Sequence, residues 1–134
     1  MITVVINGSL YENIDLQAVD ELGNPIYPEL QDVNTLKRGL VDALLWLQNE
    51  RVKKILRDYD YLDMGDLLDT ANNTQDPDNQ EAVAILNWYR EYYTQIDNQI
   101  SAIQNTPDSE LLNVDVKALE KEAFNNALTV SPLP

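Results

Sequence analysis

Two long stretches with helical periodicity limit the fold of this chain more than any other feature of its sequence. Apolar residues recur every three or four positions from residue 34 to residue 58, and again from residue 79 to residue 103. In the first stretch they form two neighbouring rows, one of Leu36, Leu40, Leu44 and Leu47 and the other of Val41, Leu45, Val52 and Leu56. A helix with so wide an apolar side must pack against another element, so we expect an antiparallel pair of long helices.

Strand and turn signals come before the first long helix. Residues 2–6 are rich in β-branched side chains and lead into Asn7-Gly8, a dipeptide typical of tight turns. Polar and apolar residues then alternate from Asn13 to Val19, which predicts a partner strand. We therefore expect a small N-terminal β hairpin or an extended arm, packed on the helices or on a partner, because an isolated hairpin is barely stable in water.

Two shorter helices complete the predicted fold. One is expected from Asp63 to Thr70, with Leu67 and Leu68 packed inward, and the other from residue 116 to residue 127 with Asp115 as its N-terminal cap. The predicted fold class is thus mainly α: two long antiparallel helices plus short helices, with a small N-terminal β hairpin or extended arm.

The length of 134 residues and the apolar content of 44% suit one domain with one core. Within it we expect residues 1–33 to form the β or extended arm, residues 34–128 the helical domain, and residues 129–134 an extended tail with two prolines. No uncharged apolar run approaches about 18 residues, and the first residues lack the pattern of a signal peptide, so we expect no membrane segment and no export.

Two residue types that most enzymes use are missing from the sequence. The chain has no Cys and no His, which excludes disulfides, thiolate metal sites, the usual zinc sites and a Ser-His-Asp triad. Motifs for phosphate binding, dinucleotide binding and hydrolysis are also absent. We therefore predict a protein that is not an enzyme and has no cofactor, although a cleft with two or more converging carboxylates would favour catalysis.

The net charge of −14 makes nucleic acid an unsuitable partner, because the whole surface repels phosphates. The charge is distributed unevenly. Residues 1–36 contain six acids and no base, residues 58–79 contain seven Asp and no base, and residues 37–57 hold six of the nine bases. We predict that this basic part of the first long helix pairs with acidic segments of the same chain.

The aspartates after the first long helix resemble a calcium loop only at first sight. A loop of EF-hand spacing that begins at Asp58 would place Leu62 at a ligand position, Asp63 where glycine is needed, and Asp69 where a bidentate Glu belongs. We therefore predict no metal site.

Aromatic residues gather on the second long helix. Written in sevens, this helix has a wide apolar side that lasts about three heptads. Tyrosine and tryptophan bury large rings while keeping a polar tip, which suits an interface. The rings could fill the seam between the two long helices or bind another protein, and both could hold. The predicted partner-binding residues are Trp88, Tyr89, Tyr92, Tyr93, Ile96 and Trp46.

The stretch "LDMGDLLDTANNTQDPDNQEAVAILNWYREYYTQID" resembles small accessory proteins encoded next to the tail-fibre genes of tailed bacteriophages. The segments "DELGNPIYPEL" and "LQNERVKKIL" are similar to that group as well, and the resemblance covers residues 30–125. It implies a tail-fibre assembly chaperone, with a phage tail-fibre subunit as its protein partner, in the cytoplasm of the host during phage assembly. The alternative is a permanent structural subunit or adaptor in the tail of the virion, and homo-oligomers are compatible with either role.

Overall fold

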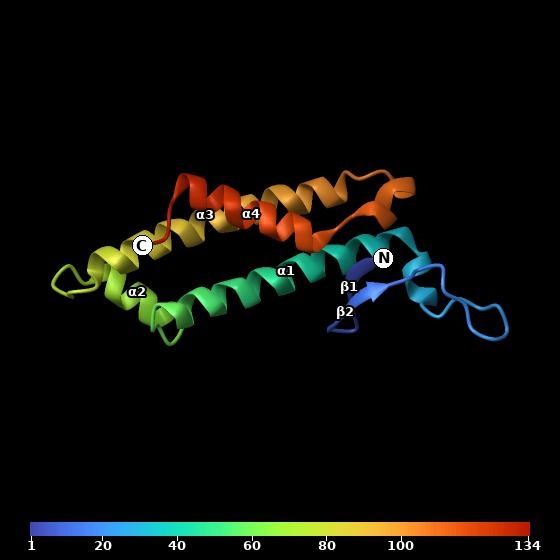
Figure 1. The fold of residues 1–134 in the computed structure, drawn as a ribbon, viewed down its shortest axis with the longest axis horizontal. Coiled ribbons are helices and arrows are strands. Elements are labelled where there is room, and N and C mark those ends of the chain that lie inside the picture. Colours follow the sequence, from blue (N-terminus) through green and yellow to red (C-terminus); the bar gives the residue numbers. More distant parts are fainter.

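The computed structural model describes all 134 residues and is mainly helical (Figure 1). Two strands open the chain, four α-helices follow, and short 3-10 turns precede α1 and α4. The elements are β1 (Ile2–Ile6), β2 (Ser9–Ile14), η1 (Pro28–Gln31), α1 (Val33–Asp58), α2 (Met64–Asn72), α3 (Asn79–Gln104), η2 (Asp108–Asn113) and α4 (Val116–Val130). The predicted fold class is confirmed. None of these helices is long and apolar enough to span a bilayer.

The N-terminal strands form an antiparallel hairpin, but the second strand is not where the alternating pattern predicts it. The strand β2 begins directly after Asn7-Gly8, and Val4 pairs with Tyr11. The backbone of Asn7 and Gly8 has φ values of 51° and 80°, the left-handed pair that a two-residue hairpin turn requires. This turn fixes the register, so the alternation from Asn13 onward lies mostly in the loop beyond the strand.

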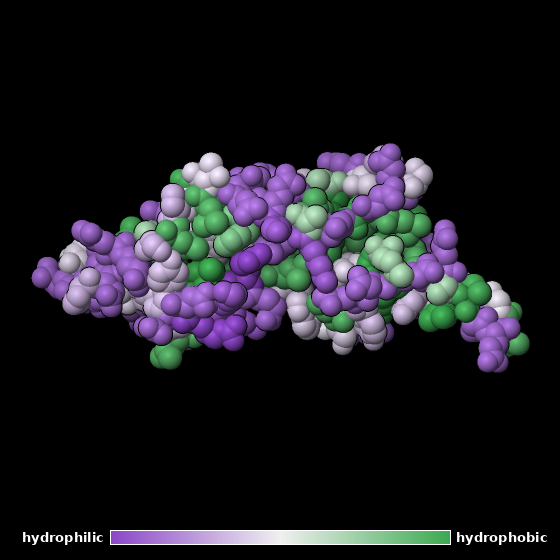
Figure 2. All heavy atoms as spheres, viewed as in Figure 1, coloured by the Kyte–Doolittle hydropathy of each residue, from purple (hydrophilic) through white to green (hydrophobic).

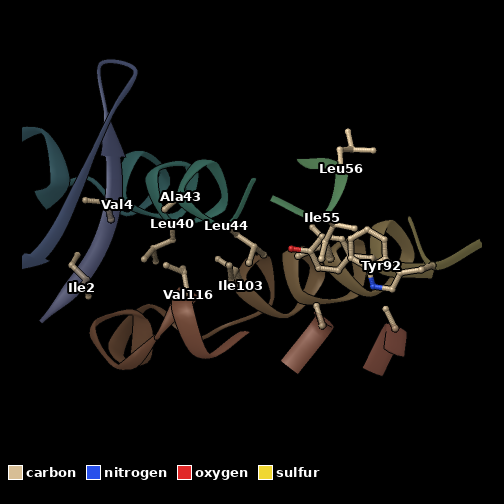
Figure 3. Packing of buried hydrophobic residues seen from close by; sticks show 14 of the residues in the cluster. Ile2, Val4, Leu40, Ala43, Leu44, Ile55, Leu56, Tyr92, Ile103 and Val116 are labelled. Atoms are coloured by element: carbon tan, nitrogen blue, oxygen red, sulfur yellow. The ribbon is translucent and has the colours of Figure 1, made fainter. Parts of the chain in front are cut away.

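The hairpin packs on α1 and shares its core. Ile2, Val4 and Ile14 are buried in the same cluster as the helices, and Figure 3 shows Val4 beside Ala43 of α1. Close approach is possible because Gly39 lies opposite β1, where an added Cβ atom would come 3.1 Å from the carbonyl oxygen of Val5. Gly39 has a low helix propensity, but its lack of a side chain allows the hairpin to pack closely on α1.

Three helices form the body of the molecule. The helices α1 and α3 run antiparallel, as predicted, and α4 lies along α3 (Figure 1). The helix α1 begins one residue before the predicted start at residue 34, and Asp32 is its cap, since the Asp32 carboxylate accepts a hydrogen bond from the backbone N–H of Thr35 at 3.1 Å. The predicted cap of α4, Asp115, is confirmed by its bond from the N–H of Ala118. The helix α4 runs to Val130, beyond the predicted end at residue 127.

Two of the shorter segments differ in part from their predictions. In α2, Leu67 is fully buried, but Leu68 is 38% exposed, because a two-turn helix packed on α3 can turn only one of two adjacent leucines inward. The last four residues are an extended tail that folds back onto the bundle. Leu133 packs against the core, and the hydroxyl of Tyr59 donates a hydrogen bond to the carbonyl of Pro134.

The basic segment of α1 forms ion pairs within the chain, as predicted, but only one of them reaches the two acidic segments that flank it in the sequence. Lys54 pairs with Asp58 in the acidic segment that follows, but no base of α1 pairs with residues 1–36. The pair with the least exposed side chains joins Arg51 to Glu120 of α4 at 2.7 Å. The fold brings α4 alongside α1, which the order of charges along the sequence does not reveal.

Candidate docking groove

Three of the six predicted partner-binding residues are buried inside the molecule. The exposed fractions of Trp88, Tyr92 and Ile96 are 1% or less. The rings of Trp88 and Tyr92 stack at 5.1 Å, and each meets the edge of Phe124 from α4. As a docking surface these three residues were predicted wrongly, because α4 covers this side of α3 and makes the rings part of the core.

A polar network fixes α4 in this position. The carboxylate of Glu120 accepts two hydrogen bonds from Arg51, at 2.7 Å and 3.2 Å, and a third from the hydroxyl of Tyr92 at 2.9 Å. The guanidinium of Arg51 also lies 4.1 Å from the centre of the Phe124 ring. Charge-assisted bonds to one carboxylate thus connect α1, α3 and α4. The indole Nε1 of Trp88 is the one buried side-chain polar atom without a hydrogen-bond partner.

Burial and the carboxylate change the proton affinities in this network. Burial raises the pKa of Tyr92 above its ordinary value, and the neighbouring charge of Glu120 raises it further. The hydrogen bonds to Glu120 raise the pKa of Arg51. Tyr92 therefore stays neutral and Arg51 stays charged at neutral pH, which suits a structural role for their bonds to Glu120.

An apolar groove of about 480 Å³ lies between the C-terminal half of α1, the α1–α2 turn and α3. Its apolar walls are Val52 and Leu56 of α1, Tyr61 and Leu62 of the turn, Met64 of α2, and Tyr89 of α3. Leu62 is 91% exposed. Figure 2 shows hydrophobic atoms protruding from the surface at the place of this turn.

The α1 wall of the groove carries positive charge in an acidic protein. Lys53 and Arg57 line it, and Asp63 is the only acid among the lining residues. Arg57 makes no ion pair, and Lys53 has only an exposed contact of 3.6 Å with Glu50. The carboxylate of Asp63 already accepts the backbone N–H of Asp66 as the cap of α2. A ligand that combines apolar and acidic groups therefore suits this groove.

One of the predicted tyrosines lines the groove and a second one contacts it, whereas the predicted tryptophan of α1 does not line the groove. Tyr89 is half-buried and lines the groove. Tyr93 follows one turn later, is 48% exposed, and has its ring centre 6.1 Å from that of Tyr89. Trp46 is 39% exposed but is not among the lining residues. The two tyrosines thus extend the apolar surface of the groove along α3.

Acidic residues line a second hollow of about 380 Å³, near the start of α2 and of α3. It includes Asp58, Asp66, Asp78 and Glu81. No group of three or more acidic side chains converges there or elsewhere closely enough to hold a metal ion. Burial raises the pKa of Tyr61, at the edge of this hollow, to about 12, and its hydrogen bond to Glu81 adds to the effect.

The groove could be anticipated only in part from the sequence. Val52 and Leu56 belong to the second apolar row of the first long helix, and that row is wider than contact with a single helix requires. The exposure of Leu62 could not be predicted, because a single leucine among aspartates is equally compatible with a buried turn. No family model, curated protein or solved structure matches the chain.

Proposed function

We propose that this chain is a non-enzymatic protein-binding module and that the groove between α1 and α3 is its docking site. What supports the proposal is the exposure of Leu62 in a groove with apolar walls, together with the half-exposed ring of Tyr93 next to Tyr89 of that groove. Soluble proteins seldom leave a continuous apolar hollow open unless a partner or ligand fills it.

The partner class rests on the resemblance of residues 30–125 to phage tail-fibre accessory proteins. A tail-fibre subunit is the partner we propose, bound in the host cytoplasm while the fibre is assembled. The role fits the chemistry of the surface, because a chaperone must cover apolar parts of an unfinished fibre while it stays soluble itself. The net charge of −14 favours that solubility.

Co-expression with the tail-fibre subunit tests the function. We expect the two proteins to purify together, and we expect Leu62→Asp to abolish the complex, because it places a charge at the apolar rim. The matched control is Val130→Ser, which changes an exposed apolar residue at the end of α4 that does not line the groove. A complex that survives Leu62→Asp unchanged would exclude the groove as the docking site.

Mass spectrometry of finished particles distinguishes a chaperone from a permanent tail subunit. A chaperone is present in complexes with fibre precursors and absent from purified virions. A structural subunit or adaptor, the alternative role, remains in the virion at a fixed ratio to the fibre protein.

A further inference from the structure

An ordered turn projects from the end of the molecule opposite α2 (Figure 1). We name residues 18–26 the loop knob. The carboxylate of Asp20 accepts hydrogen bonds from the backbone N–H groups of Leu22 and Asn24, both at 2.9 Å, and the N–H of Ile26 bonds to the carbonyl of Ala18 at 3.1 Å. These bonds hold the knob in one shape before any contact is made, which lowers the entropic cost of binding.

The loop knob presents apolar side chains to water beside a free acid. Leu22 at its tip is 85% exposed, and Val19 and Ile26 are each at least half exposed. Glu21, next to Leu22, makes no ion pair. Figure 2 shows the projecting end as a mixture of hydrophobic and hydrophilic atoms. The knob thus has the apolar and acidic character that the groove suits.

We propose that the loop knob of one copy of this chain docks into the groove of a second copy. Leu22 would lie against Val52 and Leu56, and Glu21 would pair with Arg57 on the α1 wall. Charge complementarity supports this occupant: a negative tip meets a groove that is lined by two bases and one acid.

The knob cannot reach the groove of its own chain. It ends shortly before α1, and the groove lies near the other end of that helix. The rise of an α-helix places Leu56 about 35 Å from Val33. Docking therefore joins two molecules through different surfaces, and such a contact repeats into short chains or closes into a ring. We expect the contact to be weak and reversible, because one loop in one groove is a small interface.

This inference rests on the proposed function in that it assigns an occupant to the same groove. A second copy would cover the groove until a fibre subunit displaces it. Self-association is measured on the purified chain alone, so its failure is distinct from a failure to bind a fibre subunit.

Sedimentation velocity over micromolar to millimolar concentrations tests the docking, at about 0.15 M salt so that the long-range repulsion between acidic copies is screened. We expect species larger than a dimer to grow with concentration. Leu22→Asp and Leu62→Asp should each weaken association by about tenfold or more, the size expected for losing one buried leucine contact. Val130→Ser should leave association unchanged.

Two further experiments test whether the knob of one copy contacts the groove of another. A mixture of Leu22→Asp with Leu62→Asp retains one intact knob and one intact groove, so we expect a one-to-one heterodimer and nothing larger. Glu21→Arg and Arg57→Glu should each weaken association, and their combination in one chain should restore it. A wild-type chain that stays monomeric throughout, or an association that none of these variants changes, would overturn the proposal.

Discussion

The hydroxyl of Tyr92 donates a hydrogen bond of 2.9 Å to Oε2 of Glu120, and this bond joins α3 to α4 inside the core. The same carboxylate binds Arg51 of α1. A single side chain on α4 therefore holds three helices together.

Replacing Glu120 should destabilise the fold strongly. Glu120→Ala leaves the Arg51 charge half-buried and the Tyr92 hydroxyl without an acceptor, so we expect the free energy of unfolding to fall by about 3 kcal/mol. Tyr92→Phe removes one bond only and should cost about 1 kcal/mol. Urea unfolding measures both. Glu122→Ala, at an exposed position of the same helix, is the control and should change stability by less than about 0.5 kcal/mol.

Removing a buried ring of α3 should destabilise the fold far more than removing an exposed one. Trp88→Ala removes a buried ring that contacts Tyr92 and Phe124, and we expect a loss of about 4 kcal/mol in the free energy of unfolding. Tyr93→Ala, from the same helix, should change stability by about 0.5 kcal/mol at most because its ring is half exposed. Equal losses for the two variants in chemical denaturation would contradict the packing described here.

The contact of the hairpin with α1 should tolerate only a small residue at position 39. Gly39→Ala gains about 1 kcal/mol of helix propensity, and moving the nearby Val5 carbonyl offsets that gain. Gly39→Val adds bulk against β1 and should destabilise the fold by about 2 kcal/mol. Thermal unfolding of the two variants checks this, and a fully tolerated valine would show that the hairpin does not need the close approach.

Alkaline pH should weaken the fold through two tyrosines. Burial raises the pKa of Tyr61 to about 12 and also raises the pKa of Tyr92. A raised pKa means that the folded state holds the tyrosine proton more tightly than the unfolded state does. The contribution of the neutral tyrosines to the free energy of unfolding is therefore complete below about pH 10 and is lost as the pH rises toward about 12. Unfolding free energies across this range should fall less steeply in a Tyr61→Phe, Tyr92→Phe double variant. A wild-type stability that stays constant across it would contradict the assignment.

The long helices could be predicted because their signals are local. The rows of Leu36 and Val41 repeat over many turns, and such repetition specifies a helix and its buried side without reference to the rest of the chain. The hairpin turn was equally readable from Asn7-Gly8, although the strand after it was placed too late, since alternation is a weaker signal than turn chemistry.

The covering of Trp88 and Tyr92 could not be predicted, because it depends on contacts distant in the sequence. It requires Phe124 and Glu120, about thirty residues away, to lie on the same side of α3. Periodicity predicts that a ring lies on the buried side of its helix, but it does not predict which other helix covers that side. The groove could not be predicted for the same reason, since its walls come from α1, α2 and α3 together.

Isothermal titration calorimetry of a purified tail-fibre subunit with this chain measures whether the groove between α1 and α3 binds a protein. We expect saturable binding to the wild type and to Leu22→Asp, and no measurable binding to Leu62→Asp. Equal affinities for the Leu62→Asp and Leu22→Asp variants would show that the subunit does not bind in the groove.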